Sequence, residues 1–152
     1  MTRNTVLRSL ALALCFATPA LFAQDAGAPP QEKKAPPSVG AHMEQLEAAM
    51  EIIVPYVQTF EGDAPMAELD KALKALQASK QQAPKTARRQ PEDKRAEFIK
   101  AYRIAINVSI RAMLDLEDAI LAKDKDAAMA ALKKVSAAKK AGHNTYKGRR
   151  RR

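Results

Sequence analysis

The sequence predicts an all-α protein, an antiparallel up-down-up-down four-helix bundle. Its composition is rich in alanine and contains only 5 glycines and 5% aromatic residues, which favours helices packed at close range over a sheet. Four segments repeat apolar residues at intervals of three and four, and short polar stretches separate them. No segment shows the alternation of a strand, and no internal repeat is present.

Residues 1–23 have the pattern of a secretory signal peptide. Arg3 and Arg8 precede an apolar run at residues 9–17, which is shorter than the roughly 20 residues of a membrane-spanning helix. We expect cleavage after Ala23, with cleavage after Ala20 as the alternative. The pattern predicts export to the periplasm without stable insertion in the membrane.

The one cysteine, Cys15, lies inside this segment. A mature chain would therefore have no disulfide, no thiolate metal site and no thiol nucleophile, and covalent attachment of a c-type haem is excluded. Removing residues 1–23 takes away two arginines and no acid, which lowers the net charge from +9 to +7.

The mature part begins with a flexible leader rich in proline and alanine, residues 24–38. A first helix is expected at 39–60, because Met43, Leu46, Met50 and further apolar residues follow the helical repeat. Pro55 predicts a kink, since proline removes a backbone donor and clashes with the preceding turn.

A second helix is expected at 64–82, with Asp63 as N-cap and Pro65 in the first turn. A polar loop follows at 83–92. A third helix at 91–122 presents a wide apolar face, and a fourth is expected at 125–147 after a break of three residues. Such short connections predict antiparallel neighbours. The bundle therefore spans 39–148, followed by a basic tail at 149–152.

Met43 near the start of the first helix and His143 near the end of the fourth are candidate ligands. Each lies 17 residues from the distal end of its helix, roughly 25 Å at 1.5 Å per residue, so the two should be level with each other. Thioether sulfur and imidazole nitrogen are axial ligands of haem iron in many electron-transfer cytochromes. The alternatives are core packing for Met43 and a helix-dipole interaction for His143. His42 is expected at the surface, although a bis-histidine site using it stays open.

Three segments resemble the soluble cytochrome b562 family: AHMEQLEAAMEII at 41–53, ELDKALKALQASKQQAPK at 68–85 and AAKKAGHNTYKGR at 137–149. The resemblance covers about residues 39–148. It implies one non-covalent haem b, with axial ligands Met43 and His143. A bound haem would have apolar walls from Leu46, Met50 and Leu73. Lys139 stands where the family has an arginine, so that it would meet a haem propionate.

The family places two phenylalanines against the haem on the third helix, and this sequence departs from that pattern. Counting back from His143 without a gap gives Tyr102 and Ile106, whereas one extra helical turn gives Phe98 and Tyr102. Both alignments stay open at this stage. The longer connection between the first two helices and Pro55 also depart from the family.

An iron with both axial positions filled has no open site for substrate, so we expect electron transfer and no enzymatic activity. No acid–base pair, nucleophile motif or phosphate-binding loop argues otherwise. The alternative is a haem-free bundle that binds other proteins. The basic surface favours an acidic redox partner protein or contact with anionic lipid, and the lack of stacking aromatics near the tail argues against nucleic acid. We expect a monomer.

Overall fold

The computed structural model describes residues 37–148. This region forms four α-helices and a short 3₁₀ helix: α1 (Val39–Thr59), α2 (Met66–Lys80), η1 (Lys85–Arg89), α3 (Glu92–Leu121) and α4 (Lys125–Tyr146). No strand occurs among residues 37–148, and the predicted fold class is confirmed. The predicted signal peptide, most of the leader and the basic tail lie outside the described residues.

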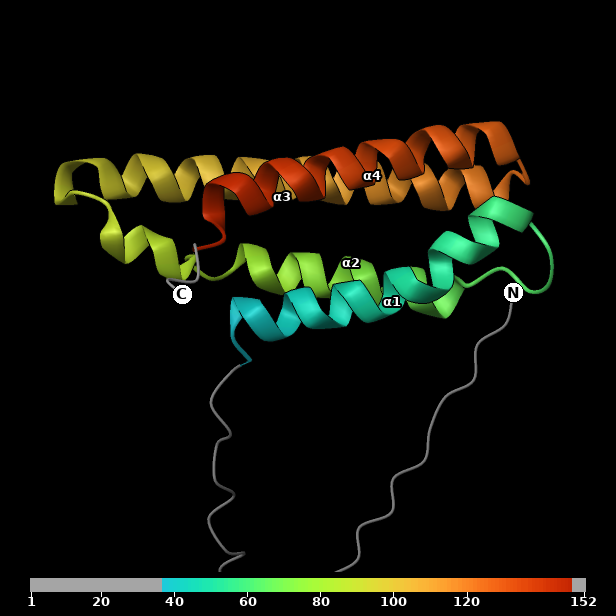
Figure 1. Ribbon diagram of the computed structural model, residues 1–152, viewed down its shortest axis with the longest axis horizontal. Coiled ribbons are helices and arrows are strands. Elements are labelled where there is room, and N and C mark those ends of the chain that lie inside the picture. Colours follow the sequence, from blue (N-terminus) through green and yellow to red (C-terminus); the bar gives the residue numbers. More distant parts are fainter. Residues whose placement is uncertain (1–36, 149–152) are drawn as a thin grey trace, which may run out of the picture. The chain divides into compact units, whose positions relative to one another are not determined.

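α1 begins and ends close to the predicted positions. The Ser38 hydroxyl accepts a hydrogen bond from the Ala41 amide at 3.3 Å, which satisfies one donor of the first turn. The helix ends because Phe60 adopts a left-handed backbone conformation with φ 62°. Pro55 lies inside the helix, and the last turns of α1 are inclined to its first part in Figure 1. The expected kink is therefore present.

α2 starts two residues later than predicted, and the assignment of Asp63 as its N-cap was wrong. Pro65 occupies the cap position and no side chain caps the helix. The physical reason is that a residue preceding proline, here Ala64, is driven away from the helical conformation. The polar loop predicted at 83–92 also contains the helix η1. At α4 the cap is Asp124, whose carboxylate accepts from the Ala127 amide at 2.9 Å.

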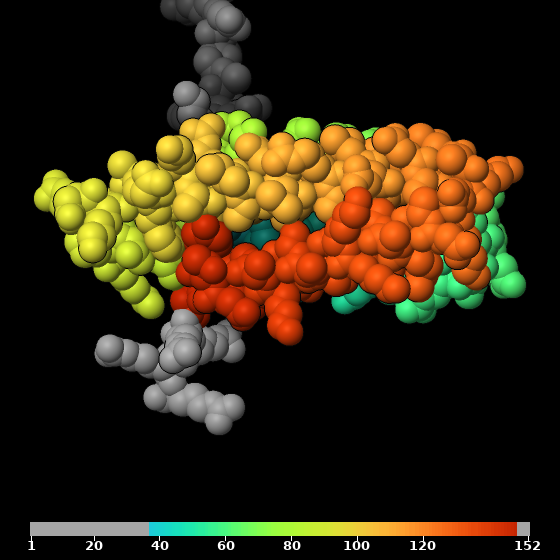
Figure 2. All heavy atoms as spheres, turned by 90° about the horizontal axis from the view of Figure 1, so that it is seen from above, coloured from blue at the N-terminus to red at the C-terminus, as the bar shows by residue number. Residues whose placement is uncertain are grey.

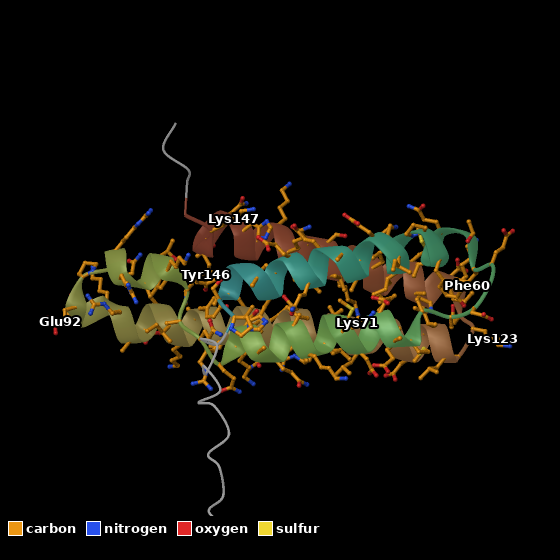
Figure 3. All side chains as sticks on the ribbon, turned by 90° about the horizontal axis from the view of Figure 1, so that it is seen from below. Phe60, Lys71, Glu92, Lys123, Tyr146 and Lys147 are labelled. Carbon is orange, nitrogen blue, oxygen red and sulfur yellow. The ribbon has the colours of Figure 1, made fainter. Side chains whose placement is uncertain are left out.

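The helices form two hairpins, α1–α2 and α3–α4, and all four run antiparallel to their chain neighbours (Figure 1). The start of α1 and the end of α4 lie at the same end of the bundle, which we call the cavity end. Figure 3 shows Tyr146 and Lys147 at that end, with Phe60 and Lys123 at the opposite, distal end. Up-and-down connection therefore places the predicted ligands at one end.

The core is densest toward the distal end. Its largest fully buried side chains include Ile53, Val57, Leu69, Leu116 and Ile120. At the cavity end, Met43, Leu46, Met50 and Tyr146 are only partly buried against this core. Within residues 37–148, no helix has the length and apolar character needed to span a lipid bilayer.

Candidate functional site

A cavity of about 820 Å³ lies at the cavity end, bounded by α1, α3 and α4. That volume is within the range of small-molecule and cofactor sites, about 300–1,000 Å³. The space-filling view in Figure 2 shows the hollow between α3 and the last turns of α4, with atoms of α1 visible at its floor. Its lining includes Met43, Leu46, Glu47, Met50, Lys85, Tyr102, Ile106, Lys139, Gly142, His143, Tyr146 and Lys147.

The structure brings Met43 and His143 to the walls of this one cavity, from α1 and α4 respectively. His42 lies elsewhere. It is 8% exposed, and its ring nitrogens lie 3.4 Å from Gln45 Oε1 and 3.5 Å from Gln82 Nε2. The expectation that His42 is a surface residue was wrong, because the connection after α2 covers it. It is not among the residues that line the cavity, so this geometry does not favour a bis-histidine pair.

Of the two alignments considered for α3, the cavity contains the residues of the ungapped one, Tyr102 and Ile106. Phe98 does not line the cavity. The expectation that Leu73 forms part of the wall was also wrong, because its side chain packs against the core instead. The ring of Phe98 packs edge-on against Tyr146 with centroids 5.2 Å apart, and Tyr146 in turn packs edge-on against Tyr102 at 5.2 Å. Phe98 therefore supports the aromatic wall from outside, and Tyr102 and Tyr146 form it.

Tyr102 is fixed in place by a buried hydrogen bond. Its hydroxyl donates to the Ser79 carbonyl of α2 at 3.1 Å, and only 3% of the residue is exposed. Burial raises the pKa of Tyr102 to about 12, because the phenolate would lose its solvation. The ring is therefore neutral at physiological pH and held in one orientation beside the cavity.

An ion pair joins α1 and α4 at the cavity. Lys139 Nζ lies 3.1 Å from Glu47 Oε1, and both side chains are about half exposed. The hydrogen bond and charge of Lys139 lower the pKa of Glu47. Lys139, which the family resemblance assigned to a propionate, is thus engaged by a carboxylate that the sequence analysis did not single out.

The surroundings of His143 favour the neutral form of its imidazole. Burial lowers the pKa of His143 from its ordinary value of 6.5, the charges of Lys147 and Lys139 lower it further, and Glu47 opposes them. Neutral imidazole is the form that coordinates a metal. The thioether of Met43 has no titratable proton, so its sulfur can donate an electron pair whatever the pH.

Gly142 leaves free space at the wall beside His143. The residue lines the cavity, and a Cβ built on it would meet no atom within 4 Å. Glycine inside a helix costs about 1 kcal/mol relative to alanine, so its presence here needs a reason. A flat group lying against the backbone would use this space. The donor set, the apolar walls and the open glycine together fit a haem.

Sequence reasoning missed the part played by η1 and the last turn of α4. Thr86 Oγ1 donates to the Tyr146 carbonyl at 2.9 Å, which fastens η1 to the end of α4 (Figure 3 labels Tyr146 and Lys147). Lys85 of η1 and Lys147 both line the cavity. The only signal in the sequence was the cluster of basic residues at 85–89, which by itself indicates no contact.

The model of the family described as cytochrome b562 matches residues 38–147. This chain belongs to the cytochrome b562 family. No curated protein and no solved structure matches it. The family consists of haem-binding electron-transfer cytochromes. The matched range includes all the cavity-lining residues named above, from Met43 to Lys147.

Proposed function

We propose that this chain is a periplasmic electron carrier that binds one non-covalent haem b, with Met43 and His143 as the axial ligands. One observation carries the proposal: a methionine of α1 and a histidine of α4 line the same cavity. Membership of the cytochrome b562 family supports it. The signal-peptide pattern of residues 1–23 supports the periplasmic location.

The bound haem would supply a one-electron redox couple. The residues of this chain do the rest. His143 and Met43 would fill both axial positions, so no position stays open for oxygen or a substrate, which favours electron transfer over catalysis. A thioether ligand favours the reduced iron and raises the reduction potential.

The remaining lining residues would control solvent and orientation. Leu46, Met50 and Ile106 keep water from the inner wall, and Tyr102 presents a fixed aromatic face. Lys139 and Lys147 place positive charge at the rim, where the carboxylates of a haem would be stabilised. Exclusion of water lowers the local dielectric constant and so tunes the potential.

The test is an absorption spectrum of the purified chain titrated with haem, in the oxidised and the dithionite-reduced states. We expect a low-spin Soret band and sharp reduced α and β bands at one haem per chain. His42→Gln is the matched control, because it removes the other histidine and leaves the cavity wall intact, and it should give the same spectrum.

Two results would overturn the proposal. A folded chain that shows no Soret shift with haem would leave a haem-free interaction bundle as the better account. If the low-spin spectrum were lost in His42→Gln and kept in His143→Ala, the histidine ligand would be His42 of α1 and not His143 of α4. Circular dichroism of each variant separates either result from a failure to fold.

A further inference from the structure

Charge is distributed unequally along the bundle. The cavity half, residues 37–49, 75–109 and 136–148, has 11 Lys and Arg against 5 Asp and Glu. The distal half, residues 50–74 and 110–135, has 7 Lys and Arg against 10 Asp and Glu. The described region is therefore a dipole of +6 and −3, and most of the residues that line the cavity lie in its positive half.

The positive groups gather where η1 meets the end of α4. Lys85 and Lys147 line the cavity, and the hydrogen bond from Thr86 to Tyr146 holds their two segments together. A Cβ on Gly148 would lie 3.4 Å from the Arg89 guanidinium, so Arg89 reaches the same corner. We call Lys85, Arg88, Arg89 and Lys147 the rim cations.

Within residues 37–148, none of the ion pairs involves a rim cation. Glu47 is paired with Lys139 across the cavity. In the sequence, four further arginines, Arg149–Arg152, follow directly after Gly148.

We propose that the rim cations form the docking surface for an acidic partner protein, which exchanges electrons with the chain at the cavity. The exchange of electrons rests on the proposed function, because it needs a bound haem, whereas the docking itself does not. Complementary charge raises the rate of encounter and orients the partner toward the redox group. A dipole whose positive end contains the cavity orients an acidic protein in that way.

An anionic membrane is the less favoured occupant. Peripheral proteins that bind lipid insert apolar side chains beside their basic residues. Among the described residues, the exposed large hydrophobic side chains are Ile52, Ile104, Val108, Leu114 and Leu121, and none of them is in η1 or the last turn of α4. The rim thus offers charge around a concavity, without an apolar face to insert.

The test compares two charge-reversal variants of the full chain. K85E/R88E/R89E changes the rim, and K123E/K125E/K133E makes the same change in charge at the distal end. Binding of fluorescent poly-L-glutamate, a probe for an acidic polypeptide, is measured by anisotropy without haem at low and moderate salt. We expect the rim variant to lose roughly 10-fold or more in affinity and the distal variant about 3-fold or less, with binding that weakens as salt rises.

A second measurement ties docking to electron transfer. The haem-loaded chain is adsorbed on gold coated with a carboxylate-terminated monolayer, and the interfacial rate is measured by voltammetry. The rim variant should transfer electrons about 10-fold more slowly than the distal variant, since only the rim turns the cavity toward the negative surface.

The outcomes separate the two proposals. Equal losses in both variants, or no binding of poly-L-glutamate together with binding to phosphatidylglycerol vesicles, would overturn the docking proposal, the second in favour of a membrane. A chain that binds no haem but still shows the rim-specific loss would overturn the proposed function and leave the docking surface standing.

Discussion

The two ends of this bundle are built from the same repeat of apolar residues, yet one is a sealed core and the other holds a cavity. At the distal end, branched side chains such as Leu69, Leu116 and Ile120 belong to the core cluster and are almost fully buried. At the cavity end, the inward positions hold Met43, Met50, Gly142 and His143, which leave about 820 Å³ between α1, α3 and α4. The buried distal side chains stabilise the bundle without involving either candidate ligand, so the cavity end can hold a ligand set.

The largest expected effect comes from removing a distal core side chain. Leu116→Ala should destabilise the chain by about 2–5 kcal/mol, because Leu116 is fully buried and its loss leaves a void. Urea unfolding followed by circular dichroism measures this, and the haem spectrum of the folded fraction should be unchanged. A loss below about 1 kcal/mol would contradict the division of roles.

His143→Ala should have the opposite pattern. We expect haem affinity to fall by about 100-fold or more, while the unfolding midpoint of the haem-free chain changes little, since His143 is only partly buried. Haem titration of the variant beside His42→Gln gives the measurement. Wild-type affinity in His143→Ala would remove this residue from the site.

Met43→Ala should change the iron's environment more than its retention. Loss of the thioether should lower the reduction potential by roughly 100 mV or more and give a spectrum without the low-spin reduced bands. Met50→Ala is the control, because Met50 lines the same cavity from the same helix. Equal shifts in both variants would indicate that a change in packing, and not in ligation, is responsible.

Tyr102→Phe tests the aromatic wall. The variant loses the hydrogen bond to the Ser79 carbonyl and should cost about 1 kcal/mol of unfolding free energy at pH 7. The pKa of Tyr102 is raised to about 12 in the folded chain, so the stability it contributes is complete below pH 10 and is lost as pH rises through 12. In a spectrophotometric titration, the variant should therefore lack the tyrosine that ionises near pH 12 in the parent chain. Identical titrations of the two proteins would count against the burial of the Tyr102 hydroxyl.

The smallest effect is expected for Glu47→Gln. Both Glu47–Lys139 and the distal pair Asp115–Lys134 are exposed ion pairs, so Glu47→Gln and Asp115→Asn should each change stability by less than about 1 kcal/mol. Only Glu47→Gln should lower the pKa of His143 further, since the Glu47 charge raises it. Proton NMR of the haem-free chain measures the imidazole titration, and equal shifts in the two variants would place Glu47 away from His143.

The repeat of apolar residues was enough to predict the four helices and their antiparallel order, because burial of one face decides both. It was also enough to place Met43 and His143 at one end. Helix starts governed by local backbone strain, as at Pro65, were predicted less well. The burial of His42 and the pairing of Lys139 with Glu47 depend on which residues meet from distant segments, and a single sequence does not contain that information.

The hydrogen bond between Thr86 and Tyr146 bears on how the cavity opens. It joins η1, which lies between the two hairpins, to the last turn of α4. In that turn the ring of Tyr146 also packs against the rings of Phe98 and Tyr102. Helix ends are the parts of a folded chain that separate at the lowest free energy. Separation of this last turn, on the microsecond to millisecond timescale of such local motions, would widen the entrance for a flat cofactor while the distal core stays folded.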